Sequence, residues 1–480
     1  MRFKKSIGLL TIFCMILCMS SVSGAVHVID DSNYSNYFDD NGNIKPTSGI
    51  NDGDTLKIGD IHGTPDNPKV FIINKRLIIT SNAPNNQIIE GRFEFVGGSQ
   101  GSSLSGIRLT STGINEHGLI YITGTDHISL KNNIVSRITD FKGAFTGYAV
   151  EVSDSSFITM ESNTFKKTGA STCLYMHDDN KNIDVISNYI SSGNKTHQGG
   201  NVVDARGSNY NINTNTIVGS PSNTCWGVKL DARNSVINGN DISGASIGIN
   251  MVGRCDNAII TNNRIHDLDD YLAIAESHIY EAIGINNVLT NIFKVENNVI
   301  SVSDKGSKVL DDPSQPIYYY AVKGSGFDKV VDRFMNNTFK ASGDRAAIVD
   351  NATGAKFNNT TLTNLQNNNN LIGRFTLGGP EFGPTPNPDP TPGTDPTPGT
   401  DPSSPESLSM SGSHSNVDGA SDASDSGEQG KADSGEQGKV HEITNSPNSG
   451  NDSPLSMVLT LIFLIMSLFA LGYMGHKSRL

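Results

Sequence analysis

The residues best able to do chemistry form two similar charged pairs in the middle of the chain. Asp204 and Arg206 form one pair, and Asp231 and Arg233 form the other, further along the chain. An aspartate and an arginine two positions apart on a strand point to the same face, here the face exposed to solvent. Such a strip could hydrogen-bond an extended glycan, because arginine grips the carboxylates of acidic sugars. It could equally be a ladder of surface ion pairs, each of which stabilises the fold only slightly.

The carboxylates of this strip also permit a catalytic interpretation. Enzymes that cleave polysaccharides need a base that faces a uronate, or a pair of acidic residues that flanks the scissile bond. Arg206 or Arg233 would then be the positive partner. No spacing in the chain is specific for this chemistry, so the sequence assigns no catalytic residue and predicts neither a metal site nor a cofactor. The acidic residues in question are Asp178, Asp179, Asp204 and Asp231.

Tyrosines are concentrated in two long insertions and provide a further group of candidates. Residues 311–322 contain Tyr318, Tyr319 and Tyr320, and residues 267–284 form the other insertion. Insertions in a solenoid emerge as loops on one face and often form the binding side. Because tyrosine combines contact area with a polar tip, we expect these residues to contact a ligand. Extracellular glycans and cell-surface proteins are the predicted partners.

A repeated phrase between residues 104 and 362 predicts the scaffold that positions these residues. The phrase is an apolar residue, two further residues, asparagine, any residue and a second apolar residue, and it recurs at short, fairly regular intervals. Leu104-Ile107-Leu109 and Phe357-Thr360-Leu362 begin and end the series with the asparagine replaced. The asparagines are Asn133, Asn163, Asn188, Asn215, Asn240, Asn263, Asn298 and Asn337.

Alternating apolar residues, many of them β-branched, indicate that each repeat consists of strands rather than helices. A unit of roughly 25 residues fits three short strands and three turns, which is one coil of a parallel β-helix. The sequence therefore predicts an all-β solenoid of about ten or more coils. The two charged pairs belong to Asp–Ala–Arg units that are 27 residues apart, one coil, so we expect these units to lie close to one above the other. We expect asparagine at the turn because it tolerates the left-handed backbone conformation, and stacked amides can also hydrogen-bond along the axis.

The N-terminal segment from Met1 to Ala25 has the pattern of a secretory signal peptide. Arg2, Lys4 and Lys5 precede an apolar run, and Ser23-Gly24-Ala25 forms a small-residue cleavage site. Loss of these three cations changes the formal net charge from −13 to −16. An acidic surface of this kind disfavours nucleic acid as a partner.

Three cysteines lie beyond the leader, at Cys173, Cys225 and Cys255. Cys173 precedes Asn188 at the same spacing at which Cys225 precedes Asn240, so the two cysteines occupy the same slot two coils apart. At about 4.8 Å per coil they are roughly 9.6 Å apart, beyond the ~7 Å limit for a disulfide. We expect all three to be buried as small apolar residues.

The composition changes abruptly after residue 382. Residues 383–454 contain Pro/Thr/Asp and Ser/Gly/acidic repeats. We expect a disordered linker there, because such repeats cannot bury an apolar core. Residues 455–474 carry no charge and are long enough to cross a bilayer, and cations follow in residues 475–480. This pattern predicts a single-pass protein of the cell membrane, with the β-helix of residues 26–382 outside the cell and a short cytoplasmic tail.

The beginning of the predicted solenoid resembles a known family. The segments YSNYFDDNGNIK (34–45), INDGDTLKIG (50–59) and KRLIITSN (75–82), followed by asparagine-turn coils, resemble adhesin-like surface proteins of methanogenic archaea. This resemblance covers roughly residues 25 to 375. It implies a pectin-lyase-like, right-handed β-helix, a cell-surface location and a binding role. We also expect Tyr34–Pro46 and Asn364–Phe382 to cover the two ends, because an uncovered end is an unpaired sheet edge.

Overall fold

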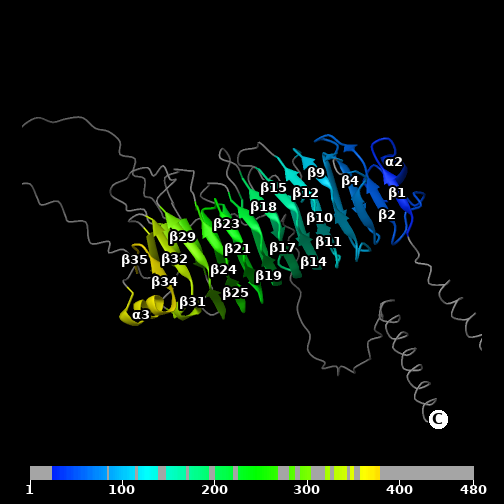
Figure 1. The fold of residues 1–480 in the computed structure, drawn as a ribbon. Helices are drawn as coiled ribbons and strands as arrows, with labels where there is room; N and C mark the ends of the chain where they lie inside the picture. Colours follow the sequence, from blue (N-terminus) through cyan, green and yellow to red (C-terminus); the bar gives the residue numbers. More distant parts are fainter. Residues whose placement is uncertain are drawn as a thin grey trace, which may run out of the picture. The chain divides into compact units, whose positions relative to one another are not determined.

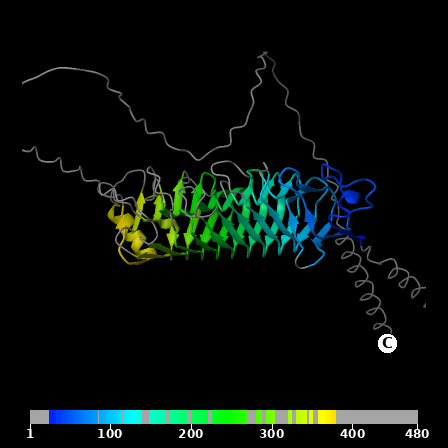
Figure 2. The same ribbon diagram turned by 90° about the horizontal axis from the view of Figure 1, so that it is seen from above.

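Successive coils of the chain place their strands side by side, and the coils stack along one axis (Figures 1 and 2). The structure, a computed structural model, describes residues 24–83, 86–113, 117–138, 147–168, 172–193, 200–219, 225–268, 280–286, 292–303, 319–324, 329–342, 346–350 and 357–378. Each regular coil contributes three strands, and each strand pairs in parallel with its counterparts in the neighbouring coils. The described part is therefore a mostly β, parallel solenoid, as the repeat predicts.

The strands form two sheets. Two rows of parallel strands share the long strand β19 (Val203–Asn213) and make one 23-stranded sheet, and a third row makes a 12-stranded sheet. The first row contains β1 (Val26–Ile29), β2 (Thr55–Ile58), β5 (Ile78–Ser81), β8 (Ser103–Ser105), β11 (Ser129–Lys131), β14 (Ser156–Glu161), β17 (Lys181–Ile186), β19, β22 (Val236–Asn238), β25 (Ala258–Thr261), β28 (Phe293–Glu296) and β31 (Phe334–Met335). The second row contains β4 (Lys69–Ile73), β7 (Gly91–Phe95), β10 (Ile120–Thr123), β13 (Val150–Ser153), β16 (Leu174–Met176), β19, β21 (Trp226–Arg233), β24 (Ile247–Val252), β27 (Tyr280–Asn286), β30 (Tyr319–Gly324), β33 (Ala346–Asp350) and β35 (Thr376–Leu377). The 12-stranded sheet contains β3 (Ile61–His62), β6 (Ile88–Ile89), β9 (Arg108–Ser111), β12 (Ile134–Arg137), β15 (Thr164–Lys167), β18 (Tyr189–Ser192), β20 (Thr216–Val218), β23 (Asp241–Ser243), β26 (Arg264–His266), β29 (Val299–Ser303), β32 (Thr338–Ser342) and β34 (Asn370–Ile372).

Alternation along each strand sends one set of side chains into a continuous apolar core. In β7, for example, Phe93 and Phe95 are fully buried, whereas Arg92 and Glu94 are partly exposed. Parallel pairing in register places equivalent side chains of neighbouring coils on one another. Phe71 and Phe93 stack in this way, with ring centroids 4.6 Å apart.

Buried asparagines form a ladder at the turn from the first row to the 12-stranded sheet, as predicted. Nδ2 of Asn215 donates to Oδ1 of Asn240 at 2.9 Å and to the carbonyl oxygen of Val185 at 2.8 Å. Its own Oδ1 accepts from the backbone N–H and from Nδ2 of Asn188, at 2.8 and 3.0 Å. Each donor and acceptor of the amide is thereby satisfied. Eight such amide–amide bonds join the nine members of the ladder, which are Asn133, Asn163, Asn188, Asn215, Asn240, Asn263, Asn298, Asn337 and Asn369.

The predicted reason for asparagine at this turn is wrong. The left-handed conformation belongs to the residue before the ladder position in the eight coils from Asn133 to Asn337, as at Thr214 with φ 53° and Gly239 with φ 66°. None of the ladder asparagines has a positive φ. Asparagine stands there because its side chain pairs buried polar groups of two neighbouring coils, which would otherwise be unsatisfied.

Aromatic residues cover the N-terminal end of the described solenoid, within the segment Tyr34–Pro46. Tyr34, which begins the short helix α2 (Tyr34–Tyr37), and Phe38, which directly follows it, pack on Phe71 with ring centroids 5.3 and 5.1 Å away. Both side chains are buried. They shield the apolar interior of the first coils from water.

The C-terminal end is covered by the helix α3 (Asn359–Asn368), which buries Leu365. The predicted last repeat, Phe357-Thr360-Leu362, is therefore not a coil. The Asn358 side chain caps this helix by accepting from the Thr361 N–H at 2.9 Å. The asparagine ladder ends just beyond the helix at Asn369, whose Nδ2 donates to the Phe334 carbonyl oxygen at 2.9 Å.

The three cysteines beyond the leader are buried, as predicted, and none of these three described residues forms a disulfide. Cys173 precedes β16 and Cys225 precedes β21, on either side of β19, which places them two coils apart. Burial raises the pKa of the thiols of Cys173 and Cys255 to about 12. Thiols of this kind are unreactive at neutral pH.

Several predicted segments lie outside the described residues. They are the leader up to residue 23, the linker 383–454, the apolar segment 455–474 and the tail 475–480. The chain divides after Thr391, and all described residues belong to the first unit. Within this part of the chain, no helix is long and apolar enough to cross a membrane.

Candidate functional site

One column of outward-facing side chains crosses the second row in the middle of the solenoid. In β13, Glu151 stands between the buried residues Val150 and Val152 and so points away from the core. Parallel register places the equivalent residues of the neighbouring strands beside it. These residues, which we call the site column, are Tyr121, Glu151, Tyr175, Asp204, Lys229 and Asn250.

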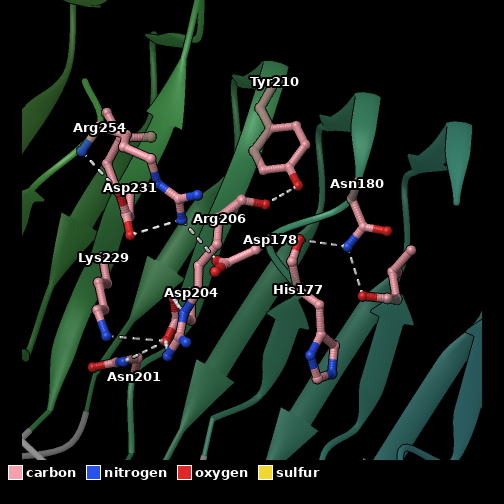
Figure 3. Close-up of polar contacts among 12 residues, drawn as sticks. His177, Asp178, Asn180, Asn201, Asp204, Arg206, Tyr210, Lys229, Asp231 and Arg254 are labelled. Atoms are coloured by element: carbon pink, nitrogen blue, oxygen red, sulfur yellow. Dashed lines mark hydrogen bonds and ion pairs between the residues drawn. The ribbon is translucent and has the colours of Figure 1, made fainter. Parts of the chain in front are cut away.

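Asp204 is the centre of an ion cluster (Figure 3). Its carboxylate accepts hydrogen bonds from Nε and Nη2 of Arg206 at 3.0 and 3.1 Å. Nζ of Lys229 lies 3.6 Å from the same carboxylate, and Nδ2 of Asn201 donates to it at 3.3 Å. The Asp204 side chain is 3% exposed, whereas Arg206 is 30% and Lys229 20% exposed. One buried carboxylate thus holds two partly exposed cations, which leaves an excess of one positive charge.

Two tyrosines fix the position of Arg206. Its guanidinium carbon lies 5.0 Å from the ring centroid of Tyr175, and the Tyr210 hydroxyl donates to the Arg206 carbonyl oxygen. Burial lowers the pKa of Arg206, but the hydrogen bonds and the charge of Asp204 outweigh burial and raise the pKa above its ordinary value. The cation is therefore permanent and is positioned before a ligand arrives.

A second ion cluster joins three coils. Nη2 of Arg254 lies 2.9 Å from Asp178, which follows β16, and 3.1 Å from Asp231 in β21. These bonds raise the pKa of Arg254, with the hydrogen bond to Asp231 as the main cause. Burial raises the pKa of Asp231, but the bonds from Arg254 outweigh burial and lower it below its ordinary value. Because two carboxylates surround this arginine, it serves the fold rather than an incoming anion.

On the other side of Tyr175, one carboxylate connects two imidazoles. Oε1 of Glu151 lies 2.9 Å from Nε2 of His177, and Oε2 lies 3.2 Å from Nδ1 of His117. The backbone N–H of Gly118 also donates to Oε2 at 2.9 Å. The Glu151 side chain is 6% exposed, whereas His117 is 44% and His177 36% exposed. A buried carboxylate that orients an exposed imidazole is the arrangement in which enzymes position a general base.

The turn that carries His177 and Asp178 is fixed by the fully buried residue Asn180 (Figure 3). Nδ2 of Asn180 donates to the carbonyl oxygens of Val152 and His177 at 2.7 and 2.9 Å. Its Oδ1 accepts from the backbone N–H of Ser155 at 3.1 Å. The amide thus joins this turn to the preceding coil, so that a rigid turn presents both polar side chains.

The predicted alignment of the two charged pairs is wrong. β19 and β21 pair so that Asp204 lies beside Lys229 and Arg206 lies beside Asp231, and the two Asp–Ala–Arg units are therefore out of register. Arg233 consequently lies in register with Ser208, is exposed and belongs to neither ion cluster. The structure brings Asp204 and Arg206 together with Lys229, and it brings Asp231 together with Arg254.

Sequence reasoning missed the contributions of Glu151, Tyr175 and Lys229. Each stands between two apolar residues, in the triplets 150–152, 174–176 and 228–230. These triplets are the second-row strands seen in sequence. Alignment of the triplets, rather than of the charged pairs, would have placed the three residues in one column with Asp204.

The predicted tyrosine loop is partly wrong as well. Tyr319 and Tyr320 belong to β30, where they pair in register with Tyr280 and Glu281 of β27, so residues 319–322 are strand and not loop. β30 lies three strands beyond β21 in the second row, roughly 14 Å away at about 4.8 Å per strand. Tyr318 lies outside the described residues.

No metal centre is found in the described ranges, where no group of three or more His, Cys, Asp or Glu side chains is arranged to hold an ion. The site as described therefore consists of hydrogen-bonding, ionic and aromatic groups alone. Such a set can bind a polar or charged ligand, and its imidazoles can exchange protons.

Comparison with known proteins finds similarity in architecture. No protein-family model matches the chain, and no curated protein sequence matches it. One similar solved structure is a mannuronic acid-specific polysaccharide family 6 lyase from human gut microbiota, with 10% identity and a TM-score of 0.31 over 72% of this chain and 91% of that chain. Another is the A-module of the mannuronan C-5 epimerase AlgE4 of Azotobacter vinelandii, with 11% identity and a TM-score of 0.28 over 68% of this chain and 89% of that chain.

Proposed function

We propose that this protein is a cell-surface binding protein whose solenoid binds glycans along the site column. The observation that carries the proposal is the column itself, in which aromatic, acidic, cationic and amide side chains follow one another on consecutive strands of one sheet. The strands are about 4.8 Å apart. A rigid and repetitive face suits an extended, repetitive ligand, because few side chains have to be ordered on binding.

An acidic saccharide is the ligand class that the Asp204 cluster favours, whereas the neighbouring Arg254 cluster has one carboxylate more than it has cations. The Asp204 cluster has one cation more than it has carboxylates, and the exposed parts of both Arg206 and Lys229 can still donate to an anion. Lys229 lies 5.6 Å from the ring centroid of Trp226, which is partly exposed at the margin of the column. A sugar carboxylate beside the two cations would thus have an aromatic surface next to it.

The location that we propose is the outer face of the cell membrane. The support is in the sequence, where a leader, a Pro/Thr/Asp-rich spacer and an uncharged C-terminal segment followed by cations surround the solenoid. The resemblance of residues 34–82 to adhesin-like archaeal surface proteins favours the same location. In this arrangement the linker 383–454 holds the binding face away from the membrane.

We also propose that the coils wind in the right-handed sense of pectin-lyase-like β-helices. The physical support is general: crossovers between parallel strands of one sheet are right-handed in about 98% of cases. Each coil of this solenoid is such a crossover, because it returns the chain to the neighbouring parallel strand.

The binding proposal is tested with the double variant Arg206→Gln, Lys229→Gln. We expect its affinity for oligomers of a uronic acid to fall at least about tenfold and its salt dependence to weaken, because both cationic donors are replaced by neutral ones. Neutral oligosaccharides serve as the comparison ligands, and circular dichroism checks the fold. The matched control is Lys181→Ala, Lys340→Ala, which removes two exposed cations from other faces of the solenoid. Equal affinity of wild type and the glutamine variant would show that the ligand does not bind at this face.

Acid–base catalysis on the same face is a second candidate function, and the Glu151 contacts favour it. His177 is oriented by this buried carboxylate and packs on the Tyr175 ring, which also contacts Arg206. A base that removes the proton next to a sugar carboxylate would need such a position. The test is the formation of unsaturated products from polyuronates by wild type and by His177→Ala. Product formed by wild type and lost in the variant would favour the enzyme, and binding without product would favour the binding protein.

A further inference from the structure

A buried carboxylate lies beside the predicted leader junction. Asp54, directly before β2, is 4% exposed. Its Oδ1 accepts from the backbone N–H of Ala25 at 2.7 Å. Its Oδ2 lies 2.9 Å from Nε2 of His27 and accepts from the Asn51 N–H at 2.8 Å. These hydrogen bonds outweigh the effect of burial and lower the pKa of Asp54, so the carboxylate is ionised at neutral pH.

This carboxylate has no permanent cation among the described residues that contact it. Two of its donors are neutral backbone amides, and the third is an imidazole. A buried charge is costly unless it is paired with an opposite charge. The Ala25 nitrogen, at 2.7 Å, is the donor that lies at the predicted leader junction, and cleavage of the backbone there would convert it into a cation.

We infer that the leader is removed between Gly24 and Ala25, and that the new α-ammonium group of Ala25 pairs with Asp54. A peptidase of the export machinery adds water across this peptide bond, so that Gly24 leaves with a carboxylate and Ala25 keeps the ammonium. The inference rests on the export proposed above. It moves the first mature residue from Val26, which the small-residue pattern predicts, to Ala25.

The contacts of Ala25 and Gly24 select this bond. The Ala25 carbonyl oxygen accepts from the Thr55 N–H at 2.8 Å and thereby begins the pairing of β1 with β2, so removal of Ala25 would lose contacts at both its ends. Gly24 is packed against the neighbouring turn, where an added Cβ would lie 2.0 Å from the Gly53 carbonyl oxygen. Cleavage after Gly24 keeps both hydrogen bonds of Ala25 in place, and it provides Asp54 with a counter-ion.

Processing then has a consequence for the fold. β1 is the first strand of the first row and pairs with β2 alone. The charge-assisted bond between the Ala25 ammonium group, directly before β1, and Asp54 stabilises this edge strand more than the neutral amide of the unprocessed chain does. The edge of the solenoid therefore becomes fully stable only after the leader has left.

The first experiment is N-terminal sequencing of the protein recovered from the cell surface. We expect Ala25 as the first residue, whereas Gly24, Val26 or a retained leader would overturn the inference.

The second experiment needs neither export nor a glycan, so its outcome is separate from the fate of the proposed function. Hydrogen exchange of the β1 amides is compared between chains that begin with free Ala25 and with acetylated Ala25, which keeps the N–H but not the charge. We expect exchange about tenfold slower in the free form. The difference should vanish in Asp54→Asn and persist in the control Asp52→Asn, which changes an exposed carboxylate two residues away. Equal exchange of the free and acetylated forms would exclude the ion pair.

Discussion

Replacement of one ladder asparagine tests what holds successive coils together. Asn215→Ala leaves the backbone N–H and one Nδ2 hydrogen of Asn188 without their acceptor. It also takes a donor from the carbonyl oxygen of Val185 and from Oδ1 of Asn240. These residues are 0–2% exposed, so bulk water cannot replace the lost partner. An unsatisfied buried donor costs about 1–3 kcal/mol, so the two donors of Asn188 predict a loss of about 2–6 kcal/mol of unfolding free energy.

The assay for this variant is denaturant titration followed by tryptophan fluorescence. Trp226 is the only tryptophan of the chain and lies in β21, one coil beyond Asn215, so it reports on the affected region. The control is Thr216→Ala, at an exposed position next to the ladder, which should change the free energy by less than about 0.5 kcal/mol. Equal midpoints for the two variants would refute the argument that the amide ladder stabilises the stack.

Three further perturbations follow from the structure. Burial lowers the pKa of Lys167 from 10.5 to about 7 in the folded protein. Between these two pH values the unfolded chain therefore binds more protons than the folded chain does. The free energy of unfolding should consequently rise from about pH 7 to pH 10.5, by up to about 5 kcal/mol. Lys167→Met should abolish this rise, whereas Lys166→Met, at the exposed neighbouring position, should leave it unchanged. An unchanged rise in Lys167→Met would show that Lys167 is not the group responsible. Asp204→Asn should tighten binding of uronic acid oligomers several-fold, because both cations lose their carboxylate, whereas Asp241→Asn on the 12-stranded sheet should leave binding unchanged. Gly207→Ala should lower the midpoint of unfolding and weaken binding together, since a Cβ at this positive-φ position of β19 would lie 2.4 Å from the Asn180 carbonyl oxygen and 2.7 Å from the Tyr210 hydroxyl. Wild-type behaviour would show that the backbone at Gly207 does not position Arg206.

The scaffold was predictable from the sequence because its determinants recur. The ladder position in each coil needs the same amide, so the phrase that contains it survives changes of loop length between coils. Thr214 and Gly239 show why the turn itself was misread, since the left-handed residue varies in type from coil to coil whereas the asparagine after it does not. The helix α3 was missed because Phe357-Thr360-Leu362 keeps the apolar spacing of a coil, although Asn358 is in fact its N-cap.

The candidate site was predictable only in part, because register decides which side chains meet. Asp204 and Arg206 contact each other within one strand, so their pairing is visible in the sequence. Lys229 comes from the next coil, and its position depends on the register between β19 and β21, which the spacing of the two charged pairs conceals. The two histidines around Glu151 come from other segments of the chain, and no local pattern predicts that they meet at one carboxylate.

The central claim is that an acidic glycan occupies the site column, and hydrogen exchange with and without a bound uronic acid oligomer tests it most directly. We expect ligand-dependent protection to be concentrated in β16, β19 and β21, the strands that carry Tyr175, Asp204 and Lys229, and to be absent with a neutral oligosaccharide. Protection confined to the 12-stranded sheet, or equal protection by neutral and acidic oligomers, would contradict the account.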